Sequence, residues 1–228
     1  MNEPDLYREW APPPAWAHAV ACCWEQRVSS TRVQRVLPDG HADVLFYDSG
    51  RIEIVGLHDE VALPVLPAGT CLRGIRFRPA AVAASFKTPA SGLRNRSLPA
   101  DNVLGSRHVC RLRDRVGVDA WIRSIEPSLR TSAALDLLAT RPVDEVAAEL
   151  AVTGRHLRRI VLAEVGLTPK MYQQVVRLQR FVRAVDAGAP LAVAAAKAGY
   201  ADQPHMTRDV RRFSGLTPAD LAHQRRTT

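Results

Sequence analysis

Basic and polar residues near the carboxyl end of the chain have types and spacings suited to contacts with DNA bases. Arginine can pair with two acceptors of guanine, and glutamine can pair with adenine. Side chains three or four residues apart share one face of a helix. The residues in question are Arg155, Arg158, Arg159, Gln203, His205, Thr207, Arg208 and Arg211. We therefore expect them to lie on the outward faces of helices, where a polyanionic partner could reach them.

These residues lie within an internal repeat. Gly166-Leu167-Thr168-Pro169 recurs 49 residues later as Gly215-Leu216-Thr217-Pro218. At the same offset, Leu157 matches Met206, Arg159 matches Arg208 and Val161 matches Val210. Before a one-residue gap the offset is 48, and it aligns Ala147 with Ala195 and Ala151 with Gly199. A run of matches in register predicts two tandem copies of one structural unit.

Each copy has the pattern of two helices joined by a tight turn. Apolar residues recur at helical spacing on both sides of a short polar break, and Thr153 and Asp202 are suited to cap the second helix of each copy. Between the copies, Pro169 begins a predicted helix that runs to about residue 187. A helix of that length spans about 27 Å, and successive major grooves are about 34 Å apart. The spacer would thus hold two reading helices about one DNA turn apart.

The tandem unit resembles the DNA-binding domain of AraC/XylS-type transcriptional regulators over residues 131–226. The order, the spacing and the presence of both copies agree. The resemblance implies a seven-helix domain with recognition helices at 154–164 and 202–213, inserted into successive major grooves of double-stranded DNA. Carried over by position, it also implies base or phosphate contacts for Arg155, Arg158, Arg159, Gln203, His205, Thr207 and Arg208. The residues that carry it are Val146-Ala147, Arg155–Arg159, Gly166–Pro169, Gly199-Tyr200, Gln203–Arg208 and Gly215–Pro218.

Three residues of the second copy depart from the usual pattern of the family. Pro204 removes a backbone donor in the first helical turn. Asp209 is expected near the DNA-facing side, where it would repel phosphate unless it paired with Arg208 or Arg212. Ala201 replaces a capping hydroxyl, so Asp202 is expected to cap the helix instead.

Charge and composition limit the classes of partner. The chain of 228 residues is 46% hydrophobic and 24% charged, with a net charge of +8, which is typical of a globular protein with a polyanionic partner. Nucleic acid, an anionic membrane or a heparin-like polymer would all satisfy this charge. Residues 131–228 hold +5 of the excess, which favours DNA. No membrane-spanning segment or basic leader is evident, and the four cysteines form no disulfide framework. We expect a cytoplasmic protein with reduced thiols.

The first half of the chain has the texture of a small β-domain. Strand-length apolar runs at 33–37, 43–47, 52–57 and 72–78 are separated by turn sequences such as Pro38-Asp39-Gly40. A short helical stretch at 80–86 follows, and residues 107–125 form a predicted helix. The fold class expected is α+β, with a β-rich, barrel-like domain or antiparallel sheet before an all-α domain. The predicted boundaries are 1–105, a helical linker 106–130, and 131–228.

Residues 7–105 resemble the short uncharacterised effector domains found ahead of AraC-type domains. The resemblance rests on Trp24, Leu37–Gly40, Asp43 and Gly74–Pro79, and it implies a sensor or dimerisation module. Trp24, Arg76 and Arg78 form the candidate effector site, in which the arginines would bind a carboxylate or phosphate. The alternative, which we favour, pairs these arginines with acids such as Asp39, Asp43 or Glu53. Similarly, Trp10, Trp16 and Trp24 line a pocket or, as we favour, pack in the core.

The cysteines and histidines of the first half lack the ligand spacing of a metal site, so we expect structural thiols, no metal and no cofactor. No catalytic motif is recognised. The leading hypothesis is a DNA-binding transcriptional regulator with a possible small-molecule effector, a possible homodimer and, in an activator, RNA polymerase as partner. Two alternatives stay open: a DNA-alkylation repair protein with a thiol acceptor, and a ligand-binding protein without a DNA role. The thiols behind the first are Cys22, Cys23, Cys71 and Cys110.

Overall fold

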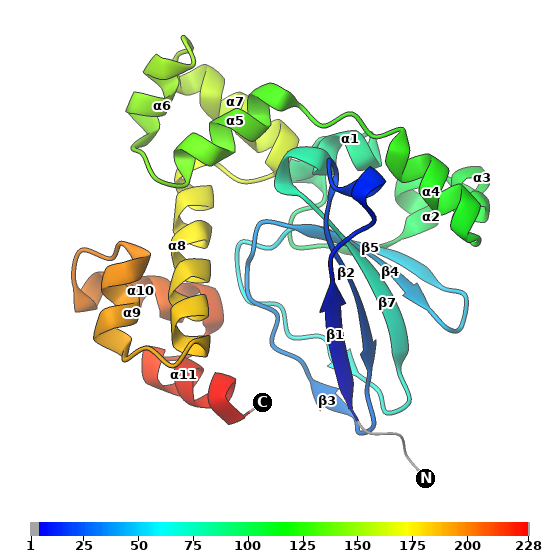
Figure 1. Cartoon of the computed structure of the whole chain (residues 1–228), viewed down its shortest axis with the longest axis horizontal. Helices are drawn as coiled ribbons and strands as arrows, with labels where there is room; N and C mark the ends of the chain where they lie inside the picture. The colour runs from blue at the N-terminus through cyan, green and yellow to red at the C-terminus, as the bar shows by residue number, and fades with distance from the viewer. Residues whose placement is uncertain (1–4, 228) are drawn as a thin grey trace.

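A six-stranded antiparallel sheet forms the first half of the molecule in the computed structural model, which describes residues 5–227 (Figure 1). Its order is β1-β2-β7-β4-β5-β8, so the sheet is open, with β1 and β8 at its edges. A separate two-stranded ribbon pairs β3 with β6. The strands are β1 (Leu6–Trp10), β2 (Val20–Arg27), β3 (Arg32–Val33), β4 (Ala42–Tyr47), β5 (Ile52–Val55), β6 (Val65–Leu66), β7 (Cys71–Phe77) and β8 (Ser97–Pro99).

Three of the four strands predicted from sequence are confirmed in β4, β5 and β7, whereas the run at 33–37 was largely wrong. Only β3 and an isolated bridge between Val36 and Ala62 form there. Gln34 donates to the carbonyl of Pro64, but proline has no N–H with which to return the bond. The ladder is therefore interrupted opposite Gln34.

The two faces of the sheet differ because side chains alternate along each strand. Val44, Ile75 and Phe77 are buried on one face beneath short helices. Trp24 and Asp43 lie on the opposite face. The helical elements of this half are η1 (Pro14–Trp16), η2 (Pro79–Ala81), α1 (Val82–Phe86), η3 (Ala90–Gly92), α2 (Ala100–Leu104), α3 (Ser106–Arg111) and α4 (Arg115–Arg123).

The prediction of a single helix at 107–125 is wrong. The structure has two helices there, α3 and α4, with a break between them. Asp114 lies at the break in extended conformation, and its carboxylate accepts a 2.7 Å hydrogen bond from the backbone N–H of Gly117. The chain also turns back closely, since a Cβ at Gly117 would come within 1.8 Å of the Arg111 carbonyl oxygen. An N-cap inside a predicted helix thus begins a second helix.

Helices α3 and α4 belong to the core of the first half. The ring centroid of Trp121 lies 5.3 Å from that of Phe77 and 6.3 Å from that of Phe86, and the two phenylalanine centroids lie 5.5 Å apart. The indole of Trp16 donates a 2.8 Å hydrogen bond to Asp119. Residues 106–125 therefore pack as part of the β-rich domain, and we propose to place its boundary at about Pro127.

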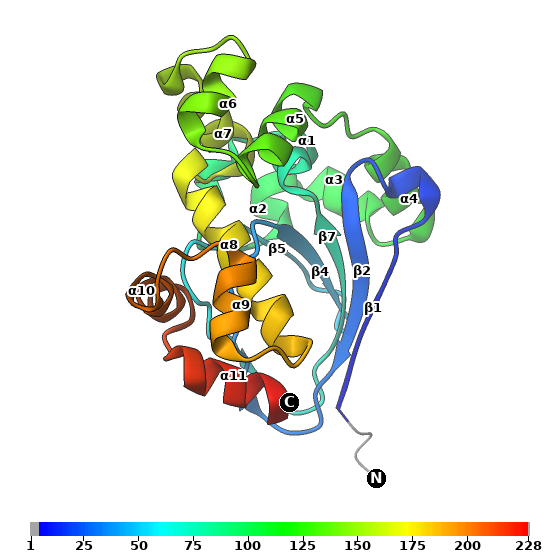
Figure 2. The same cartoon turned by 60° about the vertical axis from the view of Figure 1, so that its left-hand side comes forward.

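The second half is wholly helical, as predicted, and the α+β class is confirmed. Figure 2 shows these helices beside the sheet, with α8 running past α9 and α11. Within residues 5–227, no helix is both long and apolar enough to cross a bilayer. The helices are α5 (Leu129–Leu138), α6 (Val143–Glu149), α7 (Gly154–Val165), α8 (Pro169–Asp186), α9 (Leu191–Ala198), α10 (Gln203–Ser214) and α11 (Pro218–Thr227).

The repeated Gly-Leu-Thr-Pro sequence ends one helix and begins the next. Gly166 and Gly215 have φ of +80° and +71°, the left-handed conformation that closes a helix. The threonine hydroxyls accept from Met171 N and Asp220 N, both at 3.2 Å. Each proline then takes the first helical position, where its missing N–H costs nothing. The direction of each following helix is thus set within four residues.

If residues 106–125 belong to the first domain, Trp121→Ala should lower the free energy of unfolding of that domain by about 3–5 kcal/mol, because a large aromatic leaves the core. Val116 offers a control on the same helix, since it is 79% exposed whereas Trp121 is 6% exposed. Val116→Ala should change stability by less than about 0.5 kcal/mol. Urea unfolding followed by circular dichroism gives both values. If both substitutions had equally small effects, residues 106–125 would be a linker and not part of the first domain.

Candidate nucleic-acid interface

Helix α7 presents arginines on the side opposite its buried stripe. Leu157, Val161 and Val165 are buried, whereas Arg155, Arg158 and Arg159 are exposed. The hydroxyl of Thr153 caps the helix by accepting from His156 N at 3.2 Å, as predicted. The cap and the apolar stripe together orient the arginines outward.

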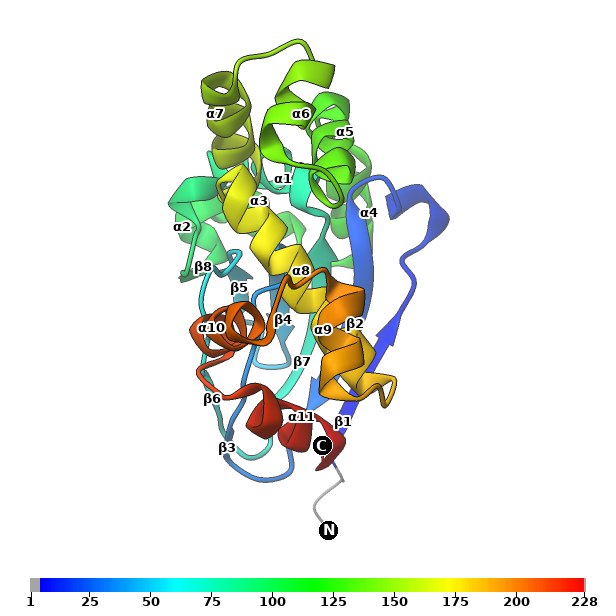
Figure 3. The same ribbon diagram turned by 90° about the vertical axis from the view of Figure 1, so that its left-hand side faces the viewer.

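Helix α10 repeats this arrangement. Met206, Val210 and Phe213 are buried, and Asp202 caps the helix by accepting from His205 N at 2.6 Å, so the expected replacement for the missing hydroxyl is confirmed. The outward-facing residues of the predicted site are Gln203, Arg208 and Arg211, with Thr207 half-buried. Figure 3 shows α7 near the upper end of α8 and α10 beside α8, where α10 contacts Gln174 and Arg177.

Asp209 does not face outward, which corrects the expectation that it would repel phosphate. Its side chain is 8% exposed and packs toward α8, where Gln174 Nε2 donates to it at 3.4 Å. Asp209 follows His205 by four residues and Met206 by three, so it belongs to the buried stripe of α10. The sequence already contained this spacing, but the prediction placed Asp209 outward because the residue is charged.

His205 also lies inward rather than toward solvent. Its Nε2 is 2.9 Å from Nη1 of Arg177 and 3.6 Å from a carboxylate oxygen of Asp209. Its ring meets that of Tyr200 edge-on at 5.3 Å, and burial raises the pKa of the Tyr200 phenol. Arg177 and Gln174, both on α8, were not predicted. No motif marks them, because they lie on the spacer helix between the two copies, which is not part of the repeat.

The outward arginines have no acidic partner in the described part of the chain, although Nη2 of Arg159 lies 3.2 Å from Nδ1 of His156. Among residues 5–227, none of the ion pairs involves Arg155, Arg158, Arg159, Arg208 or Arg211. Arg141, which is half-buried just before α6, instead pairs with Glu145 and Glu149 of α6. An arginine is thus neutralised by acids beside α6, whereas the arginines of the two outward faces lack acidic partners. Unpaired guanidinium groups on an exposed face are suited to phosphate and base contacts.

In the first half, the candidate effector residues lie only partly together. Asp43 joins two of them, accepting from Trp24 Nε1 at 2.8 Å and from Arg76 Nε at 3.2 Å. Arg76 also pairs with Asp39 at 3.6 Å and with Glu9 at 3.5 Å. The favoured interpretation, ion pairs across strands, is confirmed for Arg76. Arg78 lies beyond the end of β7, where it donates to the Ala17 carbonyl, so it does not join this cluster.

The charge cluster shifts the protonation of its members. Burial raises the pKa of the Asp43 carboxyl, and Arg76 opposes this by stabilising the charged form. Burial also acts to raise the pKa of Asp39, but His41 and Arg76 outweigh it and hold that pKa at about 2. Arg76 therefore compensates two carboxylates, and the cluster is a structural support of the sheet.

The thiols and tryptophans do not assemble into a site. Burial raises the pKa of Cys22 to about 11 and also raises that of Cys23, so both thiols stay protonated at neutral pH. Residues 5–227 contain no group of three or more metal-binding side chains. Trp16 contacts α4 and Trp24 lies over Gly74, while Trp10 is exposed. Cys22 and Cys23 are therefore poor acceptors for the alkyl transfer that the repair hypothesis requires.

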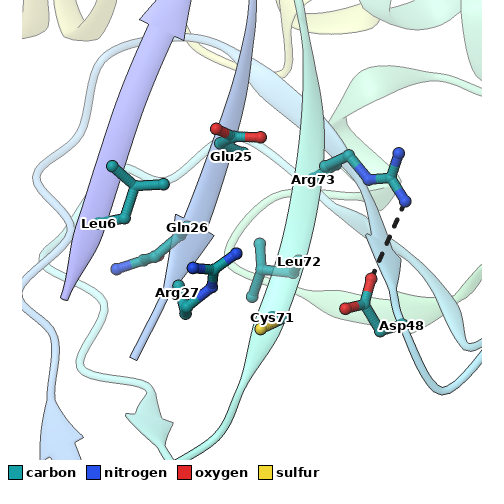
Figure 4. Close-up of a pocket in the computed structure, with 8 residues that line it drawn as sticks. All are labelled: Leu6, Glu25, Gln26, Arg27, Asp48, Cys71, Leu72 and Arg73. Atoms are coloured by element: carbon teal, nitrogen blue, oxygen red, sulfur yellow. Dashed lines mark ion pairs between the residues drawn. The ribbon is translucent and has the colours of Figure 1, made fainter. Parts of the chain in front are cut away.

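Two surface cavities lie at the end of the sheet away from α1 and α4. The first has a volume of about 220 Å³ and a charged lining, including Arg27 and Arg73 (Figure 4). The second, of about 470 Å³, lies between the β4–β5 hairpin and residues 64–71. Asp48 and Cys71 line both. Trp24, Arg76 and Arg78 line neither.

Each half of the chain matches a known family model. Residues 146–224 match a model described as a helix-turn-helix domain. The carboxyl-terminal helices are an AraC-type helix-turn-helix domain. Such domains bind DNA in transcriptional regulators, and the two outward arginine faces lie inside the matched range. Residues 8–99 match a domain of unknown function (DUF6597).

Solved structures show only distant likeness. ToxT from Vibrio cholerae O395 aligns over 88% of this chain and 95% of its own, at 11% identity and a TM-score of 0.48. A ToxT structure bound to (E)-4-(8-methylnaphthalen-1-yl)but-3-enoic acid aligns over 87% of this chain and 92% of its own, at 13% identity and a TM-score of 0.44. No curated protein matches the chain.

Replacing Arg76 tests the charge cluster. Arg76→Met should destabilise the chain by about 3 kcal/mol, because two largely buried carboxylates lose their counter-charge. Arg73 is the control on the same strand, since its side chain is 70% exposed and that of Arg76 is 21% exposed. Arg73→Met should cost about 0.5 kcal/mol or less. Urea midpoints of the two variants give the comparison; similar midpoints would mean that the cluster contributes no net stability.

Proposed function

We propose that this protein is a sequence-specific transcriptional regulator that inserts α7 and α10 into successive major grooves of one DNA segment. The observation that carries the proposal is the pair of equivalent helices whose outward arginines have no acidic partner. The family match supports DNA binding by these helices. The 18-residue α8, about 27 Å long, joins the two units along the chain.

The repeat suggests a role for each contact residue. Arg159 and Arg208 occupy equivalent positions in the two copies, and we assign both to base contacts. Arg155 is matched at the same offset by Pro204, which has no side-chain donor. The first unit would therefore make a contact that the second lacks. Gln203 and Thr207 add polar contacts, whereas Arg158 and Arg211 are suited to phosphate. His205, held by Arg177, supports the helix from behind.

The β-rich domain would supply regulation. Its cavity of about 470 Å³ falls within the size range of small-molecule sites. At the edge of the sheet, all five residues of β1 are exposed, including Leu6, Tyr7 and Trp10. An exposed edge strand of this kind is suited to pairing with a second copy. Contact with RNA polymerase would follow if the protein activates transcription.

Salt dependence tests binding to DNA. Wild-type affinity should fall steeply with salt, because phosphate contacts release counterions. Arg158→Ala should lower the slope of log affinity against log salt by about 1. Arg107→Ala, at an exposed site on α3, should leave the slope unchanged. Electrophoretic shifts on DNA upstream of the gene give the slopes, and absent or salt-insensitive binding by the wild type contradicts the proposal.

Base preference tests the two recognition helices separately. Arg159→Ala should relax the preference at one base pair by about 1–3 kcal/mol. Arg208→Ala should do the same at a position about one DNA turn away, because the two residues are equivalent in the repeat. Selection from a random-sequence library, with each variant and the wild type, shows where preference is lost. If either variant weakened binding to all sequences equally, that arginine would contact phosphate instead.

A further inference from the structure

The β-rich domain touches the two helix-turn-helix units at equivalent points. Gly166 ends α7, and a Cβ there would lie 2.8 Å from the Ala90 carbonyl oxygen and 3.0 Å from the Leu57 side chain. Gly215 ends α10, and a Cβ there would lie 3.4 Å from Nη1 of Arg35. These glycines are matched in the repeat. The carboxyl ends of both recognition helices therefore contact the first domain.

The two contacts differ in kind. At Gly166 the neighbours are backbone and the apolar side chain of Leu57, and Leu167 beside it is fully buried. At Gly215 the contact consists mainly of one long side chain, since the nearest atom of Val61 would lie at 3.7 Å. The first unit is thus held by close packing, whereas the second depends on Arg35.

Arg35 joins the last two helices of the chain. Its Nη1 donates to the Ser214 carbonyl at the end of α10, and its Nε donates at 3.1 Å to the side chain of Gln224 on α11. The last carbonyls of a helix form its negative end, so a guanidinium is favourable there. Between the two glycines, Gln179 on α8 donates at 2.6 Å to the Pro38 carbonyl. Segment 35–38 thus contacts both α8 and the carboxyl end of α10.

We infer that Arg35 is a positioning residue for DNA reading: it fixes α10 relative to α7, so that the β-rich domain sets the half-site spacing that the protein accepts. The inference rests on the proposed function, since it concerns how two recognition helices act together. Helix α8 alone joins the units along the chain, and Arg35 adds a second, lateral connection through the first domain. Without it, α10 keeps its contacts with α8 but loses the tie at its carboxyl end.

The test uses the full chain and DNA selected by the wild type from a random-sequence library. Arg35→Ala should bind the selected site about tenfold more weakly, the loss expected for a hydrogen bond from a charged group. It should lose less affinity than the wild type when two base pairs are inserted between the half-sites. Binding to DNA that carries only the first half-site should not change. Arg32→Ala is the matched control, since Arg32 lies on the neighbouring β3 and pairs with Asp5.

A second measurement requires no DNA. Hydrogen exchange of the free protein should be faster in Arg35→Ala across residues 203–227 and unchanged across 154–165. Wild-type exchange in 203–227 would overturn the inference, as would wild-type spacing preference or an equal loss on the first half-site alone. If the wild type showed no sequence preference, the proposed function would fail, while the exchange result would still decide whether Arg35 positions α10.

Discussion

The left-handed glycine at the end of each recognition helix is the constraint on which the second half of the molecule depends. Gly166 and Gly215 reverse the chain, and the threonine two residues later begins the next helix by capping it. Only glycine adopts this backbone conformation without strain and leaves room for a neighbour. The direction of α7 and α10, the side on which their arginines emerge and their contact with the β-rich domain all follow from these two turns.

Behind the recognition helices, polar side chains fix orientation where apolar packing would leave freedom. Asp209, His205 and Arg177 form a chain of contacts from α10 to α8, and none of them faces outward. Directional hydrogen bonds specify one rotation of a helix about its axis, whereas apolar contacts tolerate several. The first unit has no equivalent chain of charged contacts, and its helix instead lies against backbone at Ala90. The two units thus reach similar arrangements by different means.

The second half could be predicted from sequence almost completely, because the repeat supplied each boundary twice. Of the helices implied by the resemblance, 154–164 ends one residue before α7 ends, and 202–213 begins and ends one residue before α10 does. The first half was harder. Strand β1 is exposed along its whole length and β8 has only three residues, so neither carries an alternating apolar pattern. Asp114 begins a helix inside what periodicity predicted as one helix.

Among the site residues, Asp209 was placed wrongly because its charge was given more weight than its position on the helix. The placement of Arg35 against α10 depends on contacts 179 residues apart, which no local pattern encodes.

The packing of α4 against the sheet has a consequence for how the chain is made. Trp121 and Ile122 belong to a core that also contains Phe77 of β7 and Phe86 of α1. A nascent chain ending near residue 105 would contain every strand of the sheet yet leave one face of Phe77 and Phe86 uncovered. The β-rich domain can therefore close only after Ile125 has left the ribosome, and it can do so before α7 and α10 have emerged. The first domain would then be assembled before the helices that pack against it.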